Sequence, residues 1–545
     1  MLKKQSFACD LARHLKGETS HRSLLAGTIS VSGGIALAAI LATGAGQASE
    51  WSFPLVPDAL IVSSSTYTGT AATVTVGQTL PGGGTATNDG TYPNVFDNAK
   101  VDGSFGVTSP IILKQYFLSR DNRSAFLINS LNVTERTGIS TSFSSKSELA
   151  LNFSTSGGAL TFMGYVAPID TLDVSNSNTP GHVDPTNPVA ESFQRAIIQL
   201  KGDRPIFVTP VNTYSGNNGR AAILNDSYGA DIYYTVGNAG NGSGTPPVFI
   251  VNNTGVQIAQ PGVPDTTVVG VQQGTSGAAK GFQYGYSVTQ YGSPAYAADK
   301  SGKDDNFRGE TLFHKTLYVT KGSGGNGIDT VFQVGAAGTL PTLTTASSTQ
   351  VAILPGFPIG LATNIVTDPT KPGFATTNFH PFGIWFANAT TLYVADEGDG
   401  VVTTANALNP NAGLQKWTLS AGTWHLAYTL QKGLGLGVQY PVPGLASSLN
   451  PATDGLRNLT GKVNPDGTVT IFAITSTISA SGDQGADPNR LVTITDRLAT
   501  TSLPASEEFN VLDTAGFGQV LRGVALAQCG DQDRDRDDFS CFDRH

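Results

Sequence analysis

Charged residues, methionine and long helical patterns are all scarce in this sequence. Only 13% of the 545 residues are charged, about half of the roughly 25% that is typical of soluble domains. No stretch of 12 residues beyond residue 48 has the periodicity of an amphipathic helix. The 64 glycines instead favour strands joined by tight turns. The net charge is −9, and non-specific nucleic-acid binding is not expected because it requires a basic face.

Cysteine is limited to three residues, of which Cys9 lies in the N-terminal region. Cys529 and Cys541 both lie close to the C-terminus. In an oxidising compartment, two cysteines that close a short loop suggest a disulfide. Two free thiols in a frayed tail are the alternative.

The segment that contains these two cysteines alternates acidic residues from Asp531 to Asp538 in the manner of a calcium loop. Arg536 stands where such a loop has glycine, and Phe542 stands where it has glutamate. We therefore interpret residues 528–545 as an acidic, Cys-containing tail rather than a metal site.

The N-terminus has the pattern of an extended export signal. Several basic residues precede an apolar stretch from Leu24 to Leu41, and the small residues Ala45 to Ala48 offer a cleavage site before Ser49. The alternative is an uncleaved membrane anchor, although the apolar stretch contains Thr, Ser and Gly and is weak as a span. We predict a signal over residues 1–48, secretion or export to the periplasm, and no membrane association after cleavage.

Strand–turn–strand units recur along the remaining chain. The clearest copies are Leu317–Gly327 and Leu392–Gly400, each followed by another strand, such as Val331–Val334. A unit of this kind cannot bury its own face, so its neighbours must stack on it. One residue marks the second strand of each of six units: Ile61, Phe162, Tyr233, Tyr318, Tyr393 and Phe472.

These second strands recur about every 70–100 residues, which exceeds the usual period of about 40–50 for a four-stranded blade. The excess lies in Gly-, Asn- and Pro-rich loops. In the third unit we expect the next strand at Val248–Val251, and in the sixth at Arg490–Thr495.

The two ends of the repeat region complement each other. Leu521–Leu526 resembles an inner strand without a following partner, and Ala59–Ser63 resembles a second strand without a preceding one. The sequence therefore predicts that the C-terminal strand completes the N-terminal blade, which leaves no open sheet edge at the closure. We predict a single all-β propeller over residues 49–527, with six blades, or seven if the long first unit contains another.

The repeats resemble those of β-propellers of the NHL and YVTN type. His380–Trp385, Leu392–Asp396 and Gln415–Trp417 match the Pro-x-Gly-Ile, Leu-Tyr-Val-Ala-Asp and aromatic-centred strands of that pattern, and the other units match it loosely. The chain is also similar to a group of secreted bacterial propellers without an established activity. The resemblance implies the fold and an extracytoplasmic location, and it implies no particular reaction.

Basic residues recur at the start of the inner strands. Five units have one at this place, three of them with Asn two residues earlier: Arg220, Arg308, His380, Arg457 and Arg522, with Asn218, Asn306 and Asn378. Because inner strands line the axis of a propeller, we expect these side chains to gather around the central channel. Like charges about 8 Å apart repel by about 0.5 kcal/mol per pair even in water, so the ring requires compensation.

Two sources of compensation are open at this point. A small anionic ligand such as a phosphate, sugar acid or carboxylate suits the forked donors of arginine. Alternatively, the basic side chains pair with nearby acids and tie blade to blade. The candidate acids are Asp305, Asp454, Glu310 and Glu508.

The remaining motifs give weaker indications of function. We interpret the turn Asp396–Asp399 as solvated, because Glu397 follows a second strand and so lies in the wrong layer for a lactonase-like metal site. Trp385, Trp417 and Trp424 are expected to fill the core, with carbohydrate stacking as the alternative. No nucleophile elbow or zinc-protease motif stands out, so no catalytic residue, metal or cofactor is assigned.

The leading hypothesis is an extracytoplasmic binding or scaffold module whose cationic channel face takes a small anion or a protein partner. A lactonase-like or phytase-like hydrolase is the first alternative, by analogy of fold alone. A surface adhesion module that uses the long loops is the second.

Overall fold

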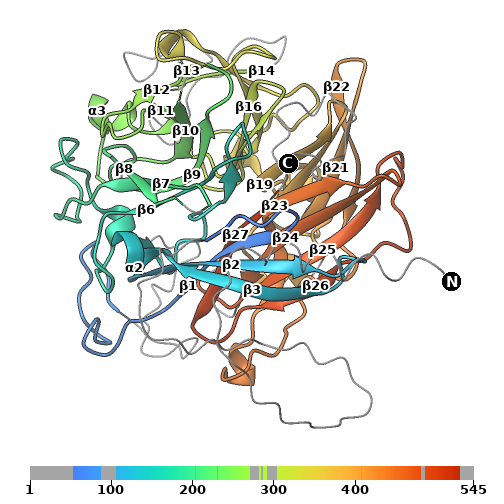
Figure 1. The fold of residues 1–545 in the computed structure, drawn as a ribbon, viewed down its shortest axis with the longest axis horizontal. Helices are drawn as coiled ribbons and strands as arrows, with labels where there is room; N and C mark the ends of the chain where they lie inside the picture. Colours follow the sequence, from blue (N-terminus) through green and yellow to red (C-terminus); the bar gives the residue numbers. More distant parts are fainter. Residues whose placement is uncertain are drawn as a thin grey trace, which may run out of the picture. The chain divides into compact units, whose positions relative to one another are not determined.

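The computed structural model describes residues 53–86, 106–202, 204–229, 231–270, 282–283, 286–290, 304–406, 408–479 and 485–527. It is all-β, with 42% strand and 7% helix, and its sheets form a β-propeller arrangement in which four blades are distinguished (Figure 1). The predicted signal (residues 1–48) and the tail with Cys529 and Cys541 lie outside the described residues. None of the described helices is long and apolar enough to cross a membrane.

The first sheet contains both ends of the repeat region. It has nine strands in the order β27-β1-β2-β4-β6-β7-β8, with β3 paired to β2 and β5 paired to β6. Its strands are β1 (Leu60–Thr66), β2 (Thr108–Leu118), β3 (Ala125–Asn132), β4 (Ser140–Ser142), β5 (Asn152–Phe153), β6 (Leu160–Tyr165), β7 (Arg195–Leu200), β8 (Phe207–Val211) and β27 (Gln519–Leu526).

The other four sheets follow in chain order, and three of them are built from consecutive antiparallel strands. The second contains β9 (Gly219–Asn225), β10 (Ile232–Gly237), β11 (Gly255–Ala259) and β12 (Thr267–Val268). The third contains β15 (Glu310–Phe313), β16 (Thr316–Lys321), β17 (Thr330–Val334) and β18 (Val351–Ile353), extended by β14 (Tyr286–Gln290), which runs parallel to β18, and by β13 (Phe282–Gln283).

The last two sheets are regular four-stranded meanders. They contain β19 (Pro381–Asn388), β20 (Thr391–Asp396), β21 (Gly413–Ser420) and β22 (Thr423–Leu430), then β23 (Ala452–Val463), β24 (Thr468–Ile478), β25 (Arg490–Arg497) and β26 (Asn510–Thr514). All six residues that mark the predicted second strands lie in the strand expected of them, in β1, β6, β10, β16, β20 and β24.

The described helices are single turns in the connections. They are α2 (Val133–Thr137), α3 (Val248–Val251), α4 (Phe374–Thr377), α5 (Val402–Asn406) and four 3-10 turns at Val174–Asn176, Ala346–Ser348, Ala362–Asn364 and Ser447–Leu449. The prediction of a strand at Val248–Val251 is therefore wrong. Pro247 precedes this apolar run and favours the first turn of a helix, and the third strand of the unit is β11 instead.

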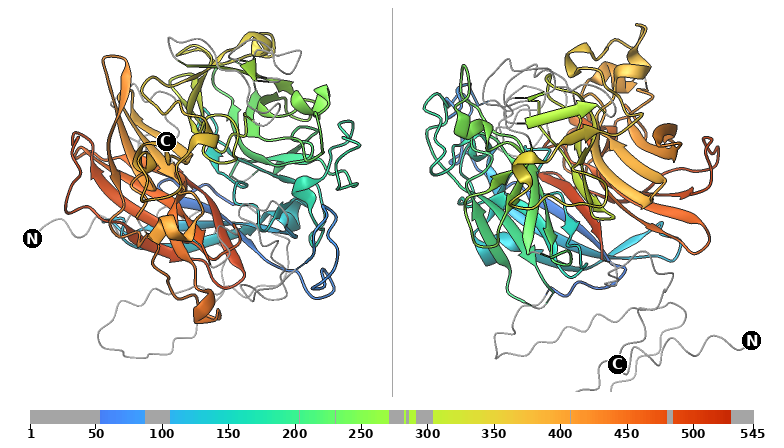
Figure 2. Two further views of the ribbon diagram at one scale, coloured as in Figure 1. Left: turned by 180° about the vertical axis from the view of Figure 1, so that it is seen from behind. Right: turned by 90° about the horizontal axis from the view of Figure 1, so that it is seen from above.

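The predicted pairing of the two ends is confirmed. β27 pairs antiparallel with β1, with Leu60 opposite Leu526 and Ile61 opposite Ala525. On its other side β1 pairs with β2, so β27 contributes the end strand of the sheet. β2 and β3 in turn lie beside β25 and β26 in each view (Figures 1 and 2), where the Tyr116 hydroxyl donates to Asp513 at 2.7 Å.

The core lies between the faces of successive sheets. Leu60 and Val62 of β1 pack with Phe472 and Ile474 of β24, and similar clusters fill the other interfaces. Trp385, Trp417 and Trp424 are all buried, which confirms that they fill the core. The end strands β9, β15, β19, β23 and β27 touch one another in this order, so the sequence repeats converge on one central region.

Candidate functional site

The predicted basic residues all lie on or directly beside these end strands. Arg220, Arg457 and Arg522 belong to β9, β23 and β27, Arg308 precedes β15 by two residues, and His380 directly precedes β19. Their placement on the inner strands is as predicted. All five side chains are buried, with His380 the most exposed at 8%.

A short segment that sequence reasoning missed connects these strands. We call Phe143–Glu148, between β4 and β5, the hub segment. Asn218 donates to the Ser145 hydroxyl at 2.7 Å, Arg522 donates to the Phe143 carbonyl at 2.6 Å, and Arg308 donates to the Ser147 hydroxyl. Lys146 forms an ion pair with Glu397 at 3.4 Å. Six consecutive residues thus contact elements of four different units.

The basic side chains are also bound by groups of their own blades or of neighbouring blades. Arg457 pairs with Glu397 at 3.0 Å, and Arg220 donates to the Phe307 carbonyl. Arg308 also donates to the Ser323 hydroxyl. Of the partners named for the arginines, Glu397 is an acid and the others are neutral carbonyls and hydroxyls. Anion binding by the ring stays a prediction.

His380 differs from the arginines. Its Nδ1 atom lies 2.9 Å from the Gly322 carbonyl and 3.9 Å from the Asp329 carboxylate, which pairs with Lys321 at 2.6 Å. Its Nε2 atom is buried and has no hydrogen-bond partner among the residues that the structure describes. The imidazole therefore belongs to a polar cluster between β16 and β19.

The three predicted asparagines have separate roles. Asn218 contacts the hub segment, as described above. The Asn378 side chain donates to Asp399 at 3.1 Å and accepts from Asn409 at 2.9 Å, so it organises the loop after β20. Asn306 donates weakly to the Ser323 carbonyl at 3.4 Å.

The interpretation of Asp396–Asp399 as a solvated turn is wrong. Asp396 is fully buried and Glu397 is 2% exposed. Asp396 accepts from the backbone N–H groups of His380 and Gly398, and burial raises its pKa to about 7. Glu397 directly follows β20, the second strand of its sheet. It nevertheless reaches Arg457 on the inner strand β23, because β20 ends close to the inner strands.

Of the four acids proposed as partners of the ring, Glu508 and Glu310 do not pair with its basic side chains. Glu508 forms an exposed ion pair with Lys432 at 3.3 Å. Both carboxyl oxygens of Glu310 are buried without a hydrogen-bond partner among the described residues. Burial alone raises the pKa of Glu310 well above its ordinary value of 4.5.

This environment predicts a pH-dependent cost to folding. Folded protein keeps a proton on Glu310 that the unfolded chain releases above about pH 4.5, so stability falls by up to about 1.4 kcal/mol per pH unit until the folded-state pKa is passed. The isosteric variant Glu310→Gln carries no such proton. We expect it to match the wild type near pH 4 and to be more stable at pH 8 in urea unfolding.

The exposed variant Glu508→Gln serves as the control and should not change this slope. Equal pH dependence in the wild type and in Glu310→Gln would contradict a protonated Glu310.

Within the described part of the chain, no group of three or more His, Cys, Asp or Glu side chains is placed to hold a metal ion. No described arrangement of a nucleophile with a base suggests itself either, so the structure assigns no catalytic residue.

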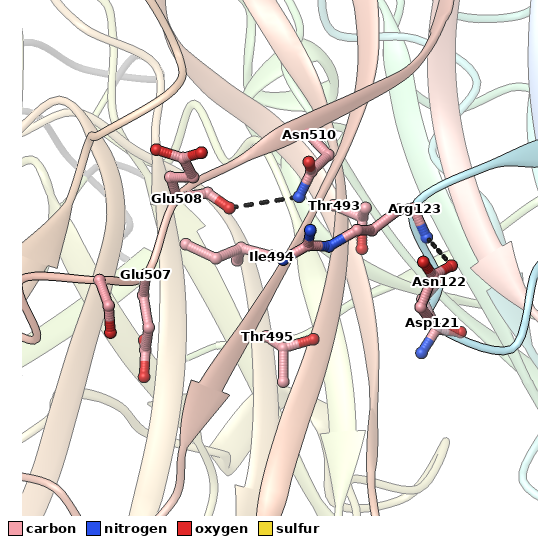
Figure 3. Close-up of a pocket in the computed structure, with 10 residues that line it drawn as sticks. Asp121, Asn122, Arg123, Thr493, Ile494, Thr495, Glu507, Glu508 and Asn510 are labelled. Atoms are coloured by element: carbon pink, nitrogen blue, oxygen red, sulfur yellow. Dashed lines mark hydrogen bonds between the residues drawn. The ribbon is translucent and has the colours of Figure 1, made fainter.

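A polar pocket lies at the outer end of the sheet formed by β23–β26 (Figure 3). It has a volume of about 170 Å³ and is lined by Asp121, Asn122, Arg123, Thr493, Ile494, Thr495, Ser506, Glu507, Glu508 and Asn510. β25 forms its floor, the turn between β2 and β3 forms one wall, and the segment that leads into β26 forms the other. The Arg123 side chain extends from its wall across the floor (Figure 3).

Local hydrogen bonds hold the β2–β3 turn in place. The Ser119 hydroxyl accepts from the backbone N–H groups of Arg123 and Ser124 at 3.1 and 2.9 Å. Asn122 adopts the left-handed conformation, with φ of 55°, and its amide donates to Thr470 on β24 at 3.5 Å. Arg123 is therefore presented from a rigid turn.

One buried polar atom of the pocket has no hydrogen-bond partner among the described residues. It is the hydroxyl of Thr493, which is 2% exposed. The Glu507 carboxyl group is hydrogen-bonded to Asp496, and burial together with this contact raises the pKa of Glu507 to about 7. Buried polar groups normally find a partner, so the Thr493 hydroxyl indicates a position that a polar molecule would satisfy.

Sequence reasoning did not find this pocket. Its two walls are almost 400 residues apart in the chain, and neither wall contains a repeated or unusual motif. The one local signal is the run of alternating threonines on β24 and β25, among them Thr470, Thr493 and Thr495, which puts polar side chains on a face that should otherwise be apolar.

Comparisons with known proteins show distant structural likeness. No protein-family model and no curated protein sequence matches the chain. A hypothetical selenium-binding protein from Sulfolobus tokodaii aligns with 9% identity and a TM-score of 0.36, over 86% of this chain and 93% of that one. A candidate 6-phosphogluconolactonase from Bacteroides uniformis aligns with 11% identity and a TM-score of 0.29, over 86% and 99%. At these scores the likeness carries no functional argument, and the fold assignment rests on the strand pairing.

Proposed function

We propose that this protein is an exported β-propeller of the NHL and YVTN kind, closed into a ring of six blades, and that it works as a binding module. The pairing of β27 with β1 supports closure. The nine-stranded sheet divides naturally into β27-β1-β2-β3 and β5-β6-β7-β8, which are joined through the pairing of β2 with β4. Together with the other four sheets this gives six units.

The pocket of Figure 3 is the proposed binding site. The observation that carries this proposal is the unpartnered Thr493 hydroxyl on its floor, a polar group that is almost completely buried. Leaving such a group unsatisfied costs about 1–3 kcal/mol, and a ligand that donates to it or accepts from it recovers that energy. Arg123 and Asn510 offer donors around the same space, and Glu508 offers an acceptor.

The charge of the lining favours a neutral ligand. Asp121, Glu507 and Glu508 oppose the single cation Arg123, which gives a net charge of −2, or −1 when Glu507 is protonated. An anion would be repelled, whereas the hydroxyl groups of a sugar can both donate to carboxylates and accept from Arg123. The volume is below the roughly 300–1,000 Å³ of pockets for drug-sized molecules, so one sugar ring or the end of a glycan is the proposed ligand.

The hub of buried arginines has a structural role in this proposal. Arg308 and Arg522 donate to Ser147 and to the Phe143 carbonyl, which ties their strands to the hub segment, and Arg457 pairs with Glu397. A small anion at Arg220, Arg308, Arg457 and Arg522 remains the competing assignment, and the experiment below separates the two.

The test is a thermal-shift and calorimetric screen with neutral mono- and disaccharides, the corresponding sugar acids and inorganic phosphate. We expect a neutral sugar to stabilise the wild type, by about 2.7 kcal/mol at a hundredfold excess over its Kd. Thr493→Val, which removes the hydroxyl at nearly constant volume, should weaken that binding about tenfold, since one hydrogen bond of a buried group contributes on the order of 1.4 kcal/mol.

Arg123→Ala should also weaken binding, whereas Thr418→Val, a half-buried strand threonine outside the pocket, should leave it unchanged. If phosphate stabilises the protein, and Arg308→Ala abolishes this effect while Thr493→Val does not, the binding site lies at the buried arginines instead. Sugar binding that Thr493→Val leaves intact would overturn the pocket assignment.

A further inference from the structure

Lys416 of β21 and Asp496 of β25 form a buried pair between two different sheets. The Lys416 Nζ atom lies 2.9 Å from Oδ2 of Asp496, and both side chains are 0% exposed. The ring centres of Tyr393 and Tyr428 lie 5.9 and 5.2 Å from the same Nζ atom. An amine nitrogen is thus held against a carboxyl group beside two aromatic rings. Reacting groups held about 3–3.5 Å apart are close to the geometry of attack.

A second carboxyl group contacts this pair. Glu507, in the segment before β26, is hydrogen-bonded to the Asp496 side chain, and its Oε1 atom accepts from the Arg497 backbone N–H at 3.3 Å. Two carboxyl groups form a hydrogen bond only when one of them carries a proton, because ionised carboxylates are acceptors alone. Burial and this contact raise the pKa of Glu507 to about 7, so Glu507 is protonated below that pH. The site therefore combines a nucleophile, an electrophile and an acid.

Lys321 and Asp329 provide a comparison within the same chain. Their side chains are 0% and 4% exposed, and Nζ lies 2.6 Å from Oδ1. Among the described residues, the other ionisable group beside Asp329 is the imidazole of His380, with Nδ1 at 3.9 Å, and not a carboxylic acid. The acid beside the pair therefore distinguishes the Lys416–Asp496 pair from an ordinary buried ion pair.

We propose that Lys416 and Asp496 condense to an intramolecular amide bond, with Glu507 as the acid–base group. The ion pair and the neutral amine–acid pair differ only in the position of one proton along the 2.9 Å contact. In the neutral pair, Nζ of Lys416 attacks Cγ of Asp496 and forms the new C–N bond. Glu507 gives its proton to the leaving hydroxyl group as the C–O bond breaks, and it takes one proton from the nitrogen. One water molecule is released and Glu507 is regenerated.

The product suits the surroundings of the pair. Amide formation removes two buried charges, whose desolvation is costly. The amide N–H keeps the Arg497 carbonyl, which lies 2.7 Å from Nζ, as its acceptor, and the remaining Asp496 oxygen keeps a tyrosine hydroxyl as its donor. Glu507 also lines the pocket of Figure 3, which offers the released water a path to solvent.

The test is mass spectrometry of the full chain under reducing conditions. We expect the wild type to be lighter than its unmodified polypeptide by one water molecule. Trypsin should not cleave after Lys416, and the peptide that contains it should be joined to the one that contains Asp496. Glu507→Gln still donates a hydrogen bond to Asp496 but transfers no proton, so amide formation should slow about a hundredfold. Glu135→Gln, at an exposed acid of α2, should react as the wild type does.

Circular dichroism checks that Glu507→Gln is folded, which is expected because glutamine has the same shape. A folded wild type with the full mass of its polypeptide would overturn the inference, as would an amide that forms equally fast in Glu507→Gln. A cross-link that maps to Lys321 and Asp329 instead would also overturn it, since that pair lacks the acid. These outcomes are independent of sugar binding, which Thr493→Val tests.

Discussion

A chain that ends at Phe517 is expected not to fold. The truncation removes β27 and with it the entire inner partner of β1. Leu521, Val524 and Leu526 are each at least 97% buried in the cluster that β1 shares with β24. Full burial of one such side chain contributes about 1.5–3 kcal/mol, so their loss alone approaches the total stability of about 5–15 kcal/mol of a typical domain.

The matched control is a chain that ends at Ala527, which retains β27 and loses only residues 528–545. We expect it to be soluble and to give a cooperative thermal transition by circular dichroism, whereas the shorter chain should aggregate or show no such transition. Similar melting curves for the two proteins would contradict a structural role for the pairing of β27 with β1.

Asp496→Ala is expected to cause the largest loss of stability from a single substitution. Asp496 is a fully buried residue of β25, and it accepts from the Tyr393 hydroxyl of β20 at 2.5 Å and the Tyr428 hydroxyl of β22 at 2.6 Å. It also pairs with the fully buried Lys416 at 2.9 Å. Removal of the carboxylate leaves the buried Lys416 ammonium without its counter-ion and the Tyr393 hydroxyl without its acceptor, while Lys416 keeps the Arg497 carbonyl at 2.7 Å. Breaking a buried ion pair in this way costs about 3–5 kcal/mol.

Chemical unfolding of the variant measures this loss. Lys432→Ala breaks the exposed pair with Glu508 and should change stability by less than about 1 kcal/mol. The double variant Lys416→Met and Asp496→Leu should recover much of the loss, because replacing both charges by apolar side chains removes the uncompensated cation. A small effect of Asp496→Ala, comparable with that of Lys432→Ala, would show that water reaches this cluster.

The repeat pattern predicted the strands well because each strand is encoded by a short, local pattern in the sequence. Tyr233, Tyr318 and Tyr393 lie at equivalent places in β10, β16 and β20, and the recurrence of this strand–turn–strand unit identifies these strands although they are buried on both faces. The complementary ends of the chain predicted the pairing of β27 with β1. The prediction of a strand at Val248–Val251 was wrong because a short apolar run is compatible with both a strand and a helical turn. Pro247, which precedes the run, favours the helical turn.

The site was harder to predict because its contacts are not local. Arg308 reaches Ser147 across 161 positions of the sequence, and nothing in Phe143–Glu148 distinguishes that segment from an ordinary loop. Periodicity placed the basic residues on the inner strands, but it could not reveal that Glu397 and a serine-rich segment of the chain would meet them. The pocket depends on Asp121 and Glu507, which only the stacking of two sheets brings together.

The link between β1 and β27 also sets the order of events during synthesis. Gly523 of β27 donates its N–H to the Ser63 hydroxyl of β1 across 460 residues. During synthesis β1 therefore lacks this neighbouring strand until β27 has left the ribosome. Until then the apolar face of β1 has no inner neighbour and is open to misassociation. A holdase that binds the nascent N-terminal region would therefore be most valuable to this protein during the whole of its elongation.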